Sequence, residues 1–349
     1  MSKPNRFSAT LPKSKYRRHR KSPLPSVAVY LAYFVDAIDS GRRLNAGKPY
    51  AKGTVEAWRN FRRIYMLFDP DGILAWCDLD KELVARFRTF MSRKGFMPTT
   101  VNKYVICFRA LAGYAYSDGV HDNHRALHIF ERRSVADSEK GAEIYLTEKE
   151  LDALAGMPLE GREEMVRDIF LVGCYTCQRV SDYANLTPRS FTRTPRGTEI
   201  IHLRQRKTGH EIKIPILNPR LKELCLKYDY SFPRVTTVEL NKTIKEILCR
   251  LAESVPTLGE KVATRKGVKQ TKGRRRKETV ELMRPRWQLV SSHTARRSGI
   301  TNLYLSGRFT TMQLMHISGH TTYKNFKQYI RLSADEIADE IAAAAEKEL

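Results

Sequence analysis

Apolar residues recur at helical spacing through the segment from Ser26 to Asp118. Thr54 and the pair Thr99-Thr100 stand where the second and fourth of these helices are expected to begin. The four groups are Val27, Tyr30, Leu31, Phe34 and Ile38; Val55, Trp58 and Tyr65; Leu83, Phe87, Phe90 and Met91; and Val101, Tyr104, Val105, Phe108, Leu111, Ala112 and Ala115. A spacing of three or four residues is that of one buried helix face, so residues 25–120 are predicted to form a small helical domain.

The pattern changes twice in the second half of the chain. Residues 121–143 are polar without a period and are predicted to be a linker. Thr147-Glu-Lys-Glu150 is a capping box that opens a second domain, expected over residues 144–332. Two β-branched runs, Glu199–Arg206 and His210–Ile216, flank Lys207-Thr-Gly209 and predict a β-hairpin. The chain is therefore predicted to be α+β, mostly α-helical, with a small antiparallel sheet.

The net charge of the chain indicates the kind of partner that it binds. The formal net charge is +24, and such an excess of cations favours a polyanion, with double-stranded DNA preferred over an anionic membrane surface. No apolar run is long enough to span a bilayer, and the N-terminus lacks the apolar core of a signal peptide. We expect a cytoplasmic, nucleoid-associated protein.

Three basic segments are candidates for DNA contacts. Residues 1–24 lack acidic residues and form a basic arm that includes Arg17, Arg18 and Arg20. Residues 261–287, a loop or a hairpin, include Arg274, Arg275 and Arg276. The first domain should have one basic side, although such helix faces are often merely solvated. Its cations are Arg59, Arg62, Arg63, Arg86, Arg88, Lys103 and Arg109.

The cysteines and the C-terminus each leave two interpretations open. Cys174 and Cys177 form a C-x-x-C, which suits a redox pair or half a zinc site, but nothing completes a zinc site and a buried helix is preferred. Residues 333–349 begin with the capping box Ser333–Glu336 and continue as a helix. Ile337 and Ile341 share one side of it, which needs a partner in its own domain or in a neighbouring subunit.

Six residues of the second domain carry candidate chemistry. Arg179 lies between two helices with Asp182 three residues later, and Lys207 lies in the hairpin turn. The remaining four are His293 and Arg296, which form H-x-x-R, and His320 after Gly319 with Tyr329 nine residues later. Each alone is unremarkable as a helix-end arginine, a turn lysine or a packed tyrosine. Their joint order resembles that of the tyrosine recombinase (phage integrase) family, most closely integrases of conjugative and other mobile elements.

The resemblance covers the whole second domain, and the first is similar to the family's helical core-binding, SAM-like domain. It implies a site-specific recombinase that cleaves DNA through a 3′-phosphotyrosine, with Tyr329 as nucleophile and no metal or cofactor. Arg179, Arg296, His293 and His320 would bind the phosphate, His293 would also serve as general base and Lys207 would protonate the leaving 5′-oxygen. Asp182 would orient one of the cations.

The sequence departs from the family pattern at three positions. Cys177 stands where Gly is common, Ser318 where Leu is common, and Asp182 where Glu is usual. A homo-tetramer on two duplexes, with accessory DNA-bending or directionality proteins, is the assembly that the resemblance implies. Two alternatives remain open, a DNA-binding regulator of the same fold that no longer cuts and a type IB topoisomerase.

Overall fold

A computed structural model describes residues 25–136, 139, 141–267, 279–332 and 334–346. The chain divides into two units, Met1–Gly141 with Thr264–Leu282 and Ala142–Ala263 with Met283–Leu349, called the first and the second unit below. Arg17, Arg18 and Arg20 of the predicted arm, and Arg274, Arg275 and Arg276, lie outside the described residues.

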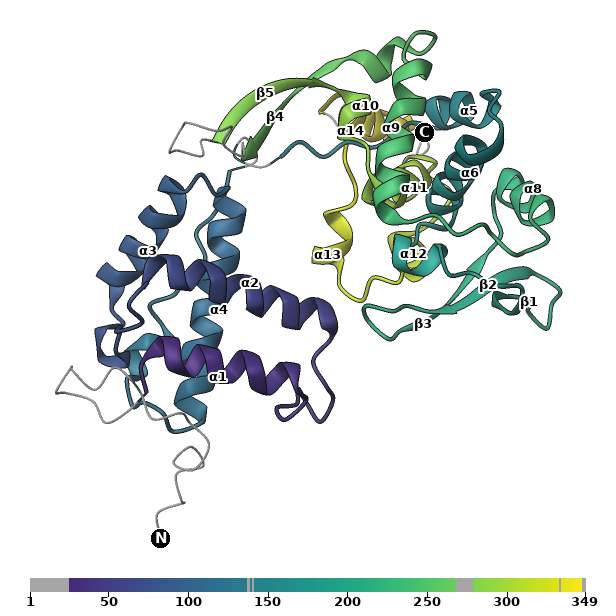
Figure 1. Cartoon of the computed structure of the whole chain (residues 1–349). Helices are drawn as coiled ribbons and strands as arrows, with labels where there is room; N and C mark the ends of the chain where they lie inside the picture. Colours follow the sequence, from purple (N-terminus) through teal and green to yellow (C-terminus); the bar gives the residue numbers. More distant parts are fainter. Residues whose placement is uncertain (1–24, 137–138, 140, 268–278, 333, 347–349) are drawn as a thin grey trace. The chain divides into compact units, whose positions relative to one another are not determined.

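The first unit is helical around one apolar core (Figure 1). Its elements are α1 (Val27–Asp39), α2 (Lys52–Phe68), η1 (Trp76–Asp78), α3 (Lys81–Arg93), α4 (Pro98–Ser117) and η2 (His124–Leu127). Two predicted helix starts were wrong by two or three residues. Helix α2 has Ala51 rather than Thr54 at its N-cap, and α4 begins at Pro98, whose fixed φ and missing N–H suit a first helical turn.

The segment predicted as a linker begins inside the first unit. Ala126 and Phe130 are fully buried in its core. Arg88, predicted on a basic surface, is instead buried. Its guanidinium donates to Asn102 Oδ1 at 3.2 Å and to the carbonyl of Glu131, so it anchors this segment and is not available to DNA. A buried cation whose donors find oxygen acceptors satisfies hydrogen bonds that solvent would otherwise supply.

The second unit holds most of the remaining elements. They are α5 (Glu148–Gly156), α6 (Gly161–Thr176), α7 (Val180–Tyr183), η4 (Pro188–Ser190), β1 (Phe191–Arg193), β2 (Glu199–Arg204), β3 (Glu211–Pro215), α8 (Pro219–Lys227), α9 (Thr237–Leu251), η5 (Pro256–Gly259), α10 (Arg286–Leu289), α11 (Ser292–Leu305), α12 (Thr311–Ser318), α13 (Tyr323–Lys327) and α14 (Ala334–Glu346). Strands β4 (Lys261–Gly267) and β5 (Thr279–Pro285) form a two-stranded sheet, as the hairpin alternative for the second basic segment requires of its described ends.

The sheet of the second unit is the predicted hairpin with one added strand. Strands β1, β2 and β3 are antiparallel in that order, with Ile201 opposite Ile214. Ile201 and Ile214 are buried in the core of the unit, whereas the intervening His202 and Lys213 are exposed. This alternation confirms the predicted strands and places the turn around Lys207 at one end of the sheet.

Helices α6 and α11 form the centre of the second unit and approach each other through glycine. A Cβ on Gly299 of α11 would lie 1.9 Å from the carbonyl oxygen of Cys174 in α6. Gly173 of α6 would likewise meet the ring of Tyr183 at 2.6 Å. Cys174 and Cys177 are buried in this contact, which agrees with the predicted buried helix, and burial raises the pKa of both thiols.

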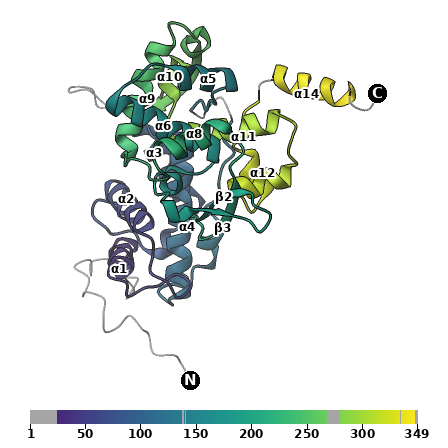
Figure 2. The ribbon, with the colours of Figure 1, turned by 90° about the vertical axis from the view of Figure 1, so that its right-hand side faces the viewer.

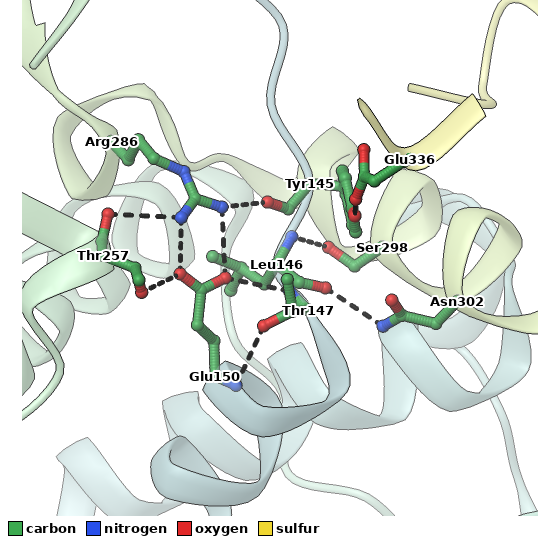
Figure 3. A network of polar contacts seen from close by, with 9 residues as sticks. All are labelled: Tyr145, Leu146, Thr147, Glu150, Thr257, Arg286, Ser298, Asn302 and Glu336. Atoms are coloured by element: carbon green, nitrogen blue, oxygen red, sulfur yellow. Dashed lines mark hydrogen bonds and ion pairs between the residues drawn. The ribbon is translucent and has the colours of Figure 1, made fainter. Parts of the chain in front are cut away.

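A buried carboxylate joins the capping box to the β4–β5 hairpin (Figure 3). Glu150 closes the predicted box with Thr147. It also accepts from both terminal nitrogens of Arg286, the residue after β5, at 2.6 and 3.1 Å, and from the Thr257 hydroxyl. Arg286 further donates to the Tyr145 carbonyl at 2.8 Å. The network ties the start of α5 to the end of the hairpin.

Helix α14 follows the segment that contains Tyr329 and extends away from the other helices of the second unit (Figure 2). Ile337 and Ile341 are 46% and 66% exposed. A hydrogen bond from the Tyr145 hydroxyl to Glu336 ties its first turn to the unit. Ser333 of the predicted capping box lies outside the described residues. Among the helices that the structure describes, none combines the length and apolar character needed to cross a membrane.

Candidate active site

Tyr329 follows the short helix α13 and is half-buried. Its ring centroid lies 4.8 Å from that of His320, 6.2 Å from that of His293 and 4.9 Å from the Arg296 guanidinium carbon. The Thr301 hydroxyl, on α11, donates to the Tyr329 carbonyl at 3.0 Å. The segment after α13 is thus fastened to the helix that carries His293 and Arg296.

Arg296 and His320 are the buried centre of the site. Arg296 is fully buried and lies in the second turn of α11, whereas His320 follows the left-handed Gly319 that ends α12. The Arg296 guanidinium is 2.9 Å from His320 Nε2 and donates to the Cys177 carbonyl at 3.0 Å. Burial lowers the pKa of Arg296, and the neighbouring Arg179 lowers it further. Burial and both arginines lower the pKa of His320 to about 3.

His293 lies in the first turn of α11 and is exposed. Desolvation of its inner side lowers its pKa, and the charges of Arg297, Arg296, Arg179 and Lys207 add to this. A neutral imidazole at this position can accept a proton, which a general base requires.

Arg179 enters the site from the junction of α6 and α7. Helix α6 ends at Cys177, whose φ of 57° and ψ of 21° are left-handed, and Arg179 is the N-cap of α7. Because glycine adopts this conformation most readily, Cys177 holds a backbone conformation that glycine would adopt with less strain. The turn aims Arg179 toward Gln205, whose Oε1 accepts from its guanidinium at 3.3 Å.

Asp182 does not contact a catalytic cation directly, contrary to its predicted role. Its Oδ1 accepts from the backbone N–H of Arg206 at 2.9 Å, beside Lys207 in the exposed β2–β3 turn. Its charge also opposes the lowering of the Arg296 pKa. Asp182 therefore supports the turn that carries Lys207 and acts on Arg296 only at a distance.

The site is an anion-binding arrangement. Arg296 and the two histidines surround the Tyr329 ring. Burial lowers the pKa values of His293, Arg296 and His320, and the charge of Arg179 lowers all three further. A phosphodiester here would supply the missing negative charge, and guanidinium groups suit its non-bridging oxygens.

Sequence reasoning missed the polar residues that support this arrangement. Gln178, Gln205 and Thr301 are fully buried. Gln205 directly follows β2 and continues its inward alternation, two residues after Leu203 and four after Ile201, so an amide at an inward position was the available signal. The buried Thr301 follows Arg296 by five residues and had no comparable signal.

Several other predicted positions lie where their patterns suggested. Tyr323, the other tyrosine near His320, is 57% exposed on α13. Lys103 is exposed on α4 of the first unit. Within the part of the chain that the structure describes, no group of three or more His, Cys, Asp or Glu side chains is placed to hold a metal ion.

Residues 30–129 match the phage integrase SAM-like domain family. The match falls on the helices of the first unit and covers fewer than half of the residues of the chain. No curated protein matches the chain by sequence.

Solved structures match nearly the whole chain. The match to the Tn1549 transposon integrase, in complex with circular intermediate DNA, spans 91% of this chain and 99% of the integrase chain, with 13% identity and a TM-score of 0.56. XerH recombinase bound to difH substrate covers 92% over 96%, with 12% identity and a TM-score of 0.61. A lambda integrase tetramer bound to a Holliday junction covers 93% over 83%, with 14% identity and a TM-score of 0.58. The matches confirm the predicted fold class and the resemblance to the tyrosine recombinases.

Proposed function

We propose that this chain, which has the fold of the tyrosine recombinases, is a site-specific DNA recombinase that integrates or excises a mobile element. The observation that carries the proposal is the position of three side chains around the ring of Tyr329: His293 and Arg296 from α11, and His320 from the segment after α12. A DNA-binding protein that does not cut would need the cations but not a tyrosine placed among them.

The chemistry follows from the side chains. Tyr329 Oη attacks the scissile phosphorus while His293 takes the phenolic proton, since a phenol with a pKa of about 10 is mostly protonated at neutral pH. The new P–O bond to tyrosine forms as the P–O5′ bond breaks, and Lys207 donates a proton to the departing 5′-oxygen. Arg179, Arg296 and His320 stabilise the charge of the transition state. The 3′-phosphotyrosine keeps the ester, so a 5′-hydroxyl of another strand can reverse the step without ATP.

The partner of this chemistry is double-stranded DNA, in keeping with the net charge of +24 and with the DNA complexes among the similar structures. The proposed assembly is a homo-tetramer, like the lambda integrase tetramer bound to a Holliday junction. Accessory DNA-bending or directionality proteins and a nucleoid location are proposed with it. The proposed domains are the 25–120 core-binding and 144–332 catalytic domains, joined by residues 121–143 and preceded by the basic arm 1–24. Phosphates would be contacted by Arg17, Arg18 and Arg20 of that arm and by Lys103 of the first domain. Arg274, Arg275 and Arg276 of the basic segment 261–287 would contact them as well.

Residues 333–349 are proposed to dock on a neighbouring subunit. Ile337 and Ile341 of α14 are exposed, and a helix with an apolar side is stabilised by a partner that covers it. A chain truncated before Ser333 should then bind DNA as wild type does but assemble poorly, which analytical ultracentrifugation on DNA would measure. Unchanged assembly of the truncated chain would contradict docking in trans.

A trapping experiment tests the reaction itself. Nicked duplexes with randomised inverted repeats around the nick release a short fragment after cleavage, which leaves the covalent complex stranded. Complexes that survive denaturation are recovered and sequenced, and peptide mapping locates the modified residue. Wild type should be trapped at Tyr329.

Two variants complete the test. Tyr329→Phe should bind the recovered duplex without forming the covalent complex, while the matched control Tyr323→Phe should be trapped as wild type is. Trapping of Tyr329→Phe, or modification of Tyr323, would refute the assignment. Relaxation of supercoiled DNA without joining of two duplexes would indicate a topoisomerase instead.

A further inference from the structure

The side chain of Gln205 occupies a buried point at which three parts of the site meet. It is fully buried at the end of β2, immediately before the turn that contains Lys207. Its Oε1 accepts from Arg179 at 3.3 Å and from the Thr208 hydroxyl at 2.8 Å. Its Nε2 donates to Gln178 Oε1 at 2.8 Å and to the Ser318 carbonyl at 3.2 Å.

The partners determine which way the amide faces. A guanidinium can only donate, so the atom toward Arg179 is the oxygen. A backbone carbonyl can only accept, so the atom toward Ser318 is the nitrogen. Gln178 is oriented in the same way, because its Nε2 donates to the carbonyls of Thr176 and Ile317 at 3.0 and 2.7 Å. The four contacts together therefore need an amide, because a carboxylate cannot donate to Gln178 and Ser318 and an apolar group makes none of the four.

The side chain of Gln205 packs directly against the backbone of Gly319. A Cβ on Gly319, the residue before His320, would lie 2.4 Å from Gln205 Nε2 and 2.7 Å from its Cδ. The backbone of Gln205 also closes the turn, since its N–H donates to the His210 carbonyl and its carbonyl accepts from the Gly209 N–H, both at 2.8 Å. Gln205 thus contacts Arg179, the turn that contains Lys207, and the Ser318–Gly319 segment that precedes His320.

We propose that Gln205 is a positioning residue that sets the Lys207 turn against Arg179 and the His320 segment, so that phosphate binding and leaving-group protonation occur at the same phosphate. This inference rests on the proposed recombinase function. Lys207 itself is exposed. The position of its side chain therefore depends on how firmly the backbone of the turn is held. Loss of the amide contacts would misplace the turn, and a misplacement of about 1 Å can reduce a rate roughly a hundredfold.

The ratio of the cleavage rates of two substrates with different leaving groups separates a positioning role from a loss of folding. Misfolding would slow both cleavages equally. The duplex recovered by trapping is synthesised with oxygen or with sulfur at the 5′-bridging position of the scissile phosphate. A thiol has a pKa of about 8.5, so the 5′-sulfur departs as a thiolate without a proton from Lys207. Single-turnover cleavage of both substrates is measured for wild type, Lys207→Ala, Gln205→Met and Gln205→Glu, with Gln288→Met of α10 as the matched control.

Gln205→Met retains the length of the side chain without its hydrogen bonds, and Gln205→Glu retains the acceptor for Arg179 but turns an oxygen toward Ser318. Both should cleave the oxygen substrate roughly a hundredfold more slowly and the sulfur substrate about tenfold more slowly or less. Lys207→Ala should show the same rescue, and Gln288→Met no change. Equal losses on the two substrates, or no loss on either, would overturn the inference. Failure of wild type to form any covalent complex would instead refute the function, before the variants are compared.

Discussion

His320 Nδ1 lies 2.8 Å from the Ser318 hydroxyl, and the Arg296 guanidinium lies 2.9 Å from Nε2 and 3.4 Å from Nδ1. A neutral imidazole carries one ring proton, and a guanidinium, which only donates, cannot accept it. The Ser318 hydroxyl donates to the Leu314 carbonyl at 2.7 Å, so it accepts from Nδ1–H. Ser318, one of the departures from the family pattern, therefore fixes the tautomer of His320, a proposed catalytic residue.

This arrangement predicts a single neutral tautomer of His320. Nitrogen-15 NMR of histidine-labelled protein should show Nδ1 protonated and Nε2 bare at pH 7. Ser318→Val removes the acceptor and leaves a buried N–H without a partner, which should lower stability by about 1–3 kcal/mol. The NMR signals of the variant should show a mixture of tautomers. A wild-type spectrum with Nε2 protonated would contradict the assignment.

Stability should fall as the pH is lowered from 7. The pKa of His320 is about 3 in the folded chain, below the usual histidine value of about 6.5, and that of His293 is also lowered. Below about pH 6.5 the unfolded chain takes up protons that the folded chain does not, so each histidine can reduce stability by at most about 1.4 kcal/mol per pH unit. The loss from His320 continues until the pH nears 3. Urea unfolding at several pH values should show a smaller slope for His320→Asn, and equal slopes would count against the prediction.

Gly299→Ala should be among the most damaging small substitutions in the chain. Its Cβ would lie 1.9 Å from the Cys174 carbonyl oxygen, so α6 and α11 would have to separate. We expect a loss of about 3 kcal/mol or more in the free energy of unfolding. Gly156→Ala is the matched control, because nothing lies within 4 Å of its Cβ and alanine favours helix by up to about 1 kcal/mol. Similar unfolding midpoints for the two variants would refute the packing argument.

Cys177 offers a comparison of backbone strain with packing. Both Cys177→Ala and Cys177→Gly remove the buried sulfur, but only glycine relieves the left-handed backbone at φ 57°. The glycine variant should therefore be the more stable of the two, by up to about 1 kcal/mol in chemical denaturation. An alanine variant that is more stable than the glycine variant would show that packing of the Cβ outweighs the strain.

The sequence alone determined much of the helical order. Val27, Tyr30 and Leu31 recur with a local period, and the Thr147–Glu150 box and the Lys207–Gly209 turn depend on residues a few positions apart, so local physics was sufficient. The predicted starts of α2 and α4 differ by two or three residues from those observed, where Ala51 caps α2 and α4 begins at Pro98. The sequence could not place them because several nearby residues can occupy an N-cap.

The candidate catalytic residues could be named from their order, but their supports could not. Arg88 reads as a surface cation, yet its partner is a carbonyl 43 residues away. In the sequence, Gln205 is a polar residue at the end of a predicted strand. Its partners Arg179, Gln178 and Ser318 lie 26, 27 and 113 positions away. A side chain's hydrogen-bond partners depend on how distant segments pack, and no local period records that packing. Only the tertiary structure therefore shows which amide, hydroxyl and glycine position Tyr329, His320 and Lys207 at the proposed phosphate site.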